Sequence, residues 1–323
     1  MDIDTNQPPP TNNGVLTRAE GLWFEDCGLI IQAEKTLFRV SRDFLAFHSP
    51  VFKDMLALPT PKDAVLMDGC PFVMLPDTAE DITVFLKALI HYDFFEPYPA
   101  PTTLAILTGV LRMSHKYEVD ALRKRGLAHI SAAHPTTLSG YQALSCESPD
   151  WLANREPLGS SPTIITLARQ LSIDWILPAA FYRLCERAIG NEVAHDSMDQ
   201  QDQVNFMGGC RFLEGTGVSE VLEFLWPRAV LGCTSPELCS TSRSMTRRMA
   251  EEWRRRGRTF QALMPIEIWE DDNWDELSVC DPCLASMKRE HQKALEAMWD
   301  SLPETFGLPA WAELEKTKRD ALY

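Results

Sequence analysis

The stretch FRVSRDFLAFHSPVFKDMLAL, residues 38–58, decides the fold that we predict for this chain. It begins as a short strand-like run and continues as two helical segments that break at Ser49-Pro50. In each segment the apolar residues approximate the i, i+4 spacing of one helical face. Pro50 suits the first turn of the second helix, because that position has no intrahelical hydrogen bond to lose. An ordinary pair of core helices has the same periodicity. The periodicity alone therefore does not identify the kind of domain, and the identities of the residues must do so.

Those residues resemble the central signature of the BTB/POZ domain, in the order Phe38-Arg39-Val40, Leu45, Ser49-Pro50-Val51-Phe52 and Met55-Leu56. FEDCGLII at 24–31, with Asp26 at the usual acidic position, is similar to the family's first strand, and VMLPD at 73–77 is similar to its third. LRMSHKYEVDAL at 111–122 resembles its A-x-K-Y-x-x-x-x-L helix, with Ser114 in place of Ala. Ser41 stands where many members carry His. The resemblance covers about residues 20–135 and implies an α/β domain, a small sheet flanked by helices.

The resemblance also implies a function. BTB domains commonly self-associate as homodimers or recruit a cullin scaffold as substrate adaptors of ubiquitin ligases, so we expect a non-enzymatic protein–protein interaction module. The positions that match the family's cullin-facing surface are Phe52, Met55, Leu56 and Tyr117. Core packing is the alternative for all of them and is favoured for Phe52.

One departure from the family pattern bears on cullin recruitment. Adaptors often carry a hydrophobic-x-Glu motif after the second signature helix, and here Thr60-Pro61-Lys62 stands in that place. A carboxylate is thus replaced by the opposite charge. The departure weakens the expectation of recruitment and leaves that of self-association unchanged.

Length and composition indicate two globular units. The chain has 323 residues, of which 45% are hydrophobic and 24% are charged, and domains average about 150 residues. We expect a disordered tail at 1–18, the BTB-like domain at 19–135, a linker at 136–161 and a mostly α-helical C-terminal region at 162–323. That helical region resembles the extensions that often follow BTB domains. LAR at 167–169, LPAA at 177–180 and WDSLPETFGLPAW at 299–311 resemble a BTB lineage expanded in mushroom-forming fungi.

Charge and hydropathy narrow the location and the partners. No apolar run reaches the ~18–20 residues of a membrane span, and the polar first residues are unlike a signal peptide. We therefore expect a cytoplasmic and/or nuclear protein without a membrane partner. The net charge of −15 disfavours general nucleic-acid binding, because a strongly acidic chain repels phosphate backbones.

Four of the nine cysteines form a candidate zinc site. Cys280 and Cys283 are spaced as CxxC, and Cys233 and Cys239 flank Pro236 as C-x5-C. Two thiolates at CxxC spacing can chelate one tetrahedral zinc, and four would make a closed structural site, giving a small zinc-stabilised element at 233–283. The upstream spacing is looser than usual, and four reduced cysteines without metal remain the alternative. A redox CxxC is disfavoured, because no thioredoxin-like βαβ pattern surrounds it.

A basic segment suggests a second function. Arg243 to Arg258 holds seven arginines, and Met245, Met249 and Trp253 recur at four-residue spacing. The pattern predicts a helix with one apolar stripe and a basic exposed side. In that alternative the chain is a BTB transcriptional or chromatin regulator that contacts DNA through this segment. The six acidic residues between Glu267 and Glu276 could instead neutralise it.

Motifs of catalysis are missing from the sequence. We find no G-x-S-x-G elbow, H-E-x-x-H helix, phosphate-cradling glycine loop or dinucleotide fingerprint. We therefore expect no catalytic residues and no cofactor other than zinc.

Overall fold

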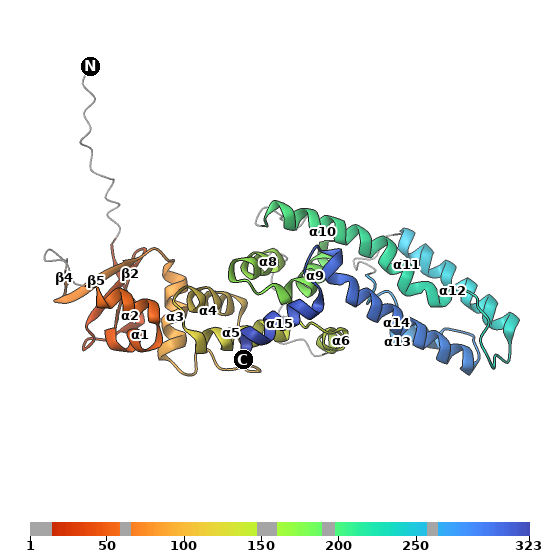
Figure 1. The fold of residues 1–323 in the computed structure, drawn as a ribbon, viewed down its shortest axis with the longest axis horizontal. Coiled ribbons are helices and arrows are strands. Elements are labelled where there is room, and N and C mark those ends of the chain that lie inside the picture. Colours follow the sequence, from red (N-terminus) through yellow and green to blue (C-terminus); the bar gives the residue numbers. More distant parts are fainter. Residues whose placement is uncertain (1–14, 59–65, 147–159, 189–197, 257–263) are drawn as a thin grey trace, which may run out of the picture. The chain divides into compact units, whose positions relative to one another are not determined.

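The computed structural model describes residues 15–58, 66–146, 160–188, 198–256 and 264–323. Its internal contacts divide the chain into unit 1, Met1–Leu127, and unit 2, Ala128–Tyr323. Unit 1 contains the five-stranded sheet and unit 2 is helical, so the chain is mixed α/β followed by a mostly helical region (Figure 1). In the described ranges, no helix is both long enough and apolar enough to cross a membrane.

The sheet of unit 1 has the strand order β1-β3-β2-β5-β4. Its strands are β1 (Thr17–Trp23), β2 (Leu29–Ala33), β3 (Thr36–Val40), β4 (Leu66–Met67) and β5 (Cys70–Leu75). β2 and β3 form a hairpin: the two strands are antiparallel, and Glu34 takes a φ of 49° in the turn. β2 lies inside the sheet, parallel to β5, and its apolar run Leu29-Ile30-Ile31 is fully buried, as expected of a strand that is covered on both faces.

The tail predicted for residues 1–18 is too long at its C-terminal end. Thr17 pairs with Thr36, and its N–H donates to the Lys35 carbonyl at 2.9 Å, so β1 joins the sheet edge by parallel pairing with β3. Residues 1–14 of the predicted tail lie outside the described residues.

The signature stretch forms the two helices that its sequence predicts. They are α1 (Arg42–His48) and α2 (Pro50–Ala57), with Pro50 in the first turn of α2. Ser41 and Ser49 cap them by accepting backbone N–H bonds from Phe44 and Phe52. In the described part of unit 1, three further helices begin: α3 (Ala79–Ile90), α4 (Leu104–Lys116) and α5 (Asp120–Ala133). Thr78 and Thr103 cap α3 and α4 in the same way.

Unit 2 is built from helices and short helical turns around an aromatic core. They are α6 (Leu138–Cys146), α8 (Ser160–Leu171), η1 (Asp174–Ile176), α9 (Leu177–Ala188), α10 (Gln200–Phe212), the π-helical turn η2 (Leu213–Gly217), α11 (Val218–Val221), η3 (Leu222–Leu225), α12 (Pro236–Arg256), α13 (Asp271–Asp275), α14 (Asp281–Thr305) and α15 (Trp311–Leu322). In the core, Phe181 stacks on Phe306 with ring centroids 4.9 Å apart, and Trp299 stacks on Trp311 at 5.8 Å. The segment 299–311 therefore supplies core residues of this unit.

The linker predicted at 136–161 is structured in its first part. Residues 138–146 form α6, and Tyr141 is buried against Trp299 with ring centroids 5.1 Å apart. The Ser, Pro and Gly content of this segment is typical of a linker between units. Packing of Tyr141 instead makes α6 part of unit 2. Residues 147–159 lie outside the described residues.

Candidate functional site

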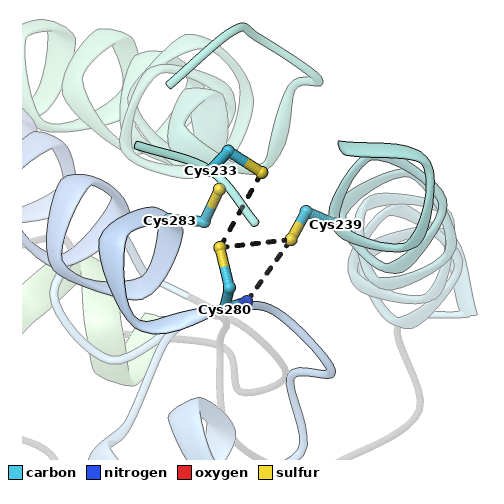
Figure 2. A group of neighbouring side chains, drawn as sticks. All are labelled: Cys233, Cys239, Cys280 and Cys283. Atoms are coloured by element: carbon cyan, nitrogen blue, oxygen red, sulfur yellow. Dashed lines mark hydrogen bonds between the residues drawn. The ribbon is translucent and has the colours of Figure 1, made fainter. Parts of the chain in front are cut away.

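The four predicted metal ligands meet in unit 2. Cys233, Cys239, Cys280 and Cys283 place their sulfurs within 4.8 Å of one another, so the group could hold a metal ion. Figure 2 shows the four side chains converging from three separate segments. The long interval between the two cysteine pairs is thus closed by the fold, which the sequence spacing alone does not reveal.

The first pair is positioned by a turn and a helix start. The N–H of Cys233 donates to the Val230 carbonyl at 3.1 Å, which closes a tight turn. Gly232 occupies that turn with a φ of 82°, a backbone conformation that glycine adopts without strain. Cys239 lies in the first turn of α12, where its N–H donates to the Ser235 carbonyl. Gly232 is therefore a supporting residue that the sequence analysis missed, although its place directly before a cysteine was a usable signal.

The second pair lies at the start of α14. Cys280 is the N-cap, Pro282 occupies the first turn and Cys283 follows one residue later. The backbone N–H of Cys280 donates to the Sγ of Cys239 at 3.3 Å. A second tie joins the same segments, because the N–H of Ser278 donates to the Oγ of Ser242 on α12 at 3.1 Å. The two pairs are thus held together by backbone hydrogen bonds as well as by their thiols.

The sulfur separations fit four-coordinate zinc and exclude a disulfide in this structure. The Cys280 sulfur lies 3.6 Å from that of Cys239 and 3.7 Å from that of Cys233. With Zn–S bonds of about 2.3 Å, the edge of a regular tetrahedron is about 3.8 Å. A disulfide needs about 2.05 Å, and all four cysteines are free thiols. The donor set and its spacing therefore match a closed tetrathiolate centre.

The surroundings of the thiols differ in their effect on ionisation. Hydrogen bonds from the backbone of Thr234 and Cys283 lower the pKa of Cys280 to about 6. Burial instead raises the pKa of Cys239, and it raises that of Cys283 to about 12. A bound dication would offset this burial cost, because it favours the thiolate form of each ligand.

The basic helix α12 does not have the orientation predicted from its periodicity. Cys239, Arg243, Arg247 and Ala250 face inward, whereas Met245 and Met249 are exposed. The predicted buried apolar stripe is therefore wrong for both methionines. Arg247 is inward because it donates to the Leu222 carbonyl and pairs with Glu251. The side chains of residues 253–256 and all of residues 257–263 lie outside the description.

Three of the four predicted partner-binding residues lie in the core of unit 1. Phe52 is 0% exposed and Tyr117 is 3% exposed; their rings stack with centroids 4.5 Å apart, and Leu56 is also buried. Their contacts are those of core packing, the alternative that the sequence left open. Met55 is the only one of the four that is partly exposed.

A series of hydrogen bonds links residues 38–58 to the end of α4. The Ser49 hydroxyl donates to the Tyr117 carbonyl at 2.6 Å, and the Tyr117 hydroxyl donates to Asp77 at 2.6 Å. Burial, followed by the bond to Asp77, raises the pKa of Tyr117 well above its usual value. Residues from three separate matches to the BTB pattern are thereby brought into contact.

Phe47 is a surface residue, although it is one of the apolar residues whose spacing predicted a single helical face. Its side chain is 84% exposed, and it lines a surface groove of about 460 Å³ with Asp43, Ala46, Pro50 and Lys53. The helical geometry explains the error: at about 100° per residue, Phe47 lies about 200° from the buried Leu45. The replaced recruitment motif at Thr60-Pro61-Lys62 lies outside the described residues.

A second group of titratable residues lies in the interior of unit 2 and includes none of the four cysteines. The Tyr182 hydroxyl donates to Glu267 at 2.8 Å and accepts the N–H of Ile266 at 3.0 Å. Burial, with the neighbouring charge of Glu186, raises the pKa of Glu267 to about 7. The group gave no motif in the sequence, because its members come from distant segments.

Comparison of this chain with protein-family models, with curated proteins and with solved structures finds no match in any of the three.

Proposed function

We propose that this chain is a BTB/POZ-type interaction protein without catalytic function. Unit 1 self-associates and/or docks a cullin-type scaffold, and unit 2 receives a protein partner. The observation that carries the proposal is the exposed Phe47 beside its groove on α1 and α2. Aromatic side chains are enriched among the residues that anchor protein interfaces, and Phe47 has a groove beside it that a partner could fill.

Two further features of unit 1 support the proposal. The contacts among Ser49, Phe52, Tyr117 and Asp77 join separate parts of the BTB-like pattern. Strand β1 lies at the sheet edge and is preceded by Val15, which is 86% exposed. An exposed strand edge with apolar neighbours favours pairing with a second copy.

We propose that zinc holds the second unit together at Cys233, Cys239, Cys280 and Cys283. The metal would join α12, α14 and the segment before α12 into one element spanning 233–283. Four thiolates leave no coordination position for a substrate, so the role of the metal would be structural. This part of the proposal is tested by the metal content of the purified chain, with one zinc per chain as the expected result.

The experiment that tests the interaction proposal uses the full chain. Light scattering measures its mass, where a dimer has twice 36.5 kDa, and titration with a cullin N-terminal domain measures recruitment. Phe47→Ala should weaken whichever association is observed by about ten-fold or more. Tyr92→Ala is the matched control, because Tyr92 is an equally exposed aromatic of unit 1 at 88%. A chain that is monomeric and does not bind the cullin domain would contradict the proposal.

The alternative, a chromatin or transcription regulator, has a narrower basis in this structure. Two arginines of its basic segment, Arg243 and Arg247, are buried, while Arg248 is exposed on the same helix. Binding to duplex DNA that weakens steeply with salt would favour this alternative.

A further inference from the structure

Arg243 is a buried cation that has no charged partner among the described residues. It is 1% exposed and lies on α12, where its Nη1 donates to the Trp226 carbonyl at 3.1 Å. Its Nε and Nη2 are buried and have no hydrogen-bond partner among the described residues. No carboxylate in the described part of the chain forms an ion pair with it. Burying an unpaired charge is costly, so this side chain requires an anionic neighbour.

The four-cysteine centre lies next to that cation. Arg243 follows Cys239 by four residues, so both lie on the same face of α12. Arg243 also lines one surface cavity of about 430 Å³ together with Cys233, Cys239 and Cys283. Arg228 lines the same cavity, but its charge is already offset by Glu290 at 3.0 Å.

Metal loading would turn the cysteine group into an anion. Four thiolates around one Zn²⁺ carry a net charge of about −2, which is more negative than the same group without metal. Most of the negative charge beside Arg243 would therefore arise when the metal is bound. In the metal-free chain the buried guanidinium has less compensation from the described residues.

We propose that Arg243 is the counter-charge of the metal centre: its buried guanidinium stabilises the tetrathiolate with its metal and opposes the metal-free fold. The inference rests on the proposed zinc site and adds to it a positioning residue outside the ligand set. Its consequence is that one substitution should weaken the zinc-loaded state without weakening the metal-free state.

The test measures zinc affinity by competition with a chelator and unfolding in the metal-free and zinc-loaded states. Arg243→Met keeps an unbranched side chain of similar length without the charge. It should lower zinc affinity by about ten-fold or more, and the metal-free protein should unfold at the same or a higher denaturant concentration than the parent. Arg243→Lys, which retains the charge, should keep affinity within about three-fold of the parent.

Arg248→Met is the matched control, because it removes the same charge from an exposed position of α12 and should leave zinc affinity unchanged. Equal zinc affinity in Arg243→Met and the parent would overturn the inference while leaving the zinc site intact. Equal destabilisation of both states would also overturn it, because that result indicates a purely structural role. A parent chain that binds no zinc would overturn the metal site itself.

Discussion

At the residue scale, the ring of Phe306 lies so close to the α10 backbone that position 209 has room only for glycine. A Cβ at this position of α10 would lie 2.1 Å from the ring of Phe306, which is itself fully buried. Phe306 stacks on Phe181, so the ring has little room to move. Nothing in the local sequence separates Gly209 from its neighbour Gly208, where a Cβ would meet no atom within 4 Å.

We therefore predict opposite effects of the same change at adjacent positions. Gly209→Ala should destabilise unit 2 by ~1–3 kcal/mol through overpacking against Phe306. Gly208→Ala should stabilise it by ~0.5–1 kcal/mol, because alanine is the better helix former. Urea unfolding followed by tryptophan fluorescence measures both, and effects of the same sign would refute the contact.

The carboxyl of Glu267 makes the stability of unit 2 depend on pH. Its pKa in the folded chain is about 7, above the ordinary glutamate value of 4.5. The folded chain then binds more protons than the unfolded chain between these values, so stability should fall as pH rises through this window. Above pH 7 the cost is at most about 3 kcal/mol.

Glu267→Gln should remove that dependence. The variant should unfold at higher urea concentration than the parent above pH 7, and the two should converge near pH 4.5. Burial also lowers the pKa of His134 to about 3 and that of His291 to about 4. Both histidines therefore reduce the stability of the folded chain in acid, but they do so equally in parent and variant. Glu304→Gln, at an exposed position, is the control, and an identical pH profile for all three proteins would contradict the prediction.

At the scale of elements, the N-caps of α1 and α2 are unequal. Ser41 makes one capping bond, from the N–H of Phe44 at 3.2 Å, and is partly exposed. Ser49 accepts from the N–H of Phe52 at 3.1 Å and also donates to the Tyr117 carbonyl, and it is buried. Ser49 thus caps α2 and ties it to the end of α4.

Replacement of the two caps should show this difference. Ser49→Ala removes two buried hydrogen bonds and should destabilise unit 1 by ~2–4 kcal/mol, whereas Ser41→Ala should cost ~0.5–1.5 kcal/mol. Circular dichroism during urea unfolding provides the measurement. Equal losses from the two substitutions would show that the bond to Tyr117 contributes nothing.

Helix α12 shows how tertiary contacts override periodicity. Its methionines recur at helical spacing, yet Arg243 and Arg247 are the residues that face inward. Carbonyl groups at Leu222 and Trp226 accept hydrogen bonds from these two guanidinium groups, and Arg247 also lies over the Trp226 ring at 5.1 Å. The inward face is selected by acceptors on a distant segment, which the sequence of α12 does not encode.

At the scale of the whole molecule, metal removal should act on one unit. Chelation of the proposed zinc, or Cys283→Ser, should lower the thermal midpoint of unit 2 by about 10 °C or more. Trp23 is the only tryptophan of the sequence within unit 1, so tryptophan fluorescence mainly reports unit 2. Cys27→Ser, in unit 1, is the control and should leave this transition in place. A midpoint insensitive to chelator in zinc-loaded protein would contradict a structural role for the metal.

The sequence by itself determined the local structure of this protein. The periodicity of residues 38–58 predicted two helices, and Ser49-Pro50 predicted the break between α1 and α2. These features depend on neighbours within a few residues, through capping bonds and the restricted backbone of proline. Cysteine spacing also predicted the four members of the candidate metal centre, because two cysteines a few residues apart can bind the same ion.

The tertiary structure decided which side chains meet and which face outward. It closed the gap between the two cysteine pairs, buried Phe52 and Tyr117 together and exposed Phe47. It also enclosed Arg243 where no described residue offers it a charged partner. Each of these outcomes depends on residues distant in sequence that compete for the same space or the same hydrogen-bond donor. Local patterns specify an element and its periodicity, whereas only packing specifies what lies against each of its faces.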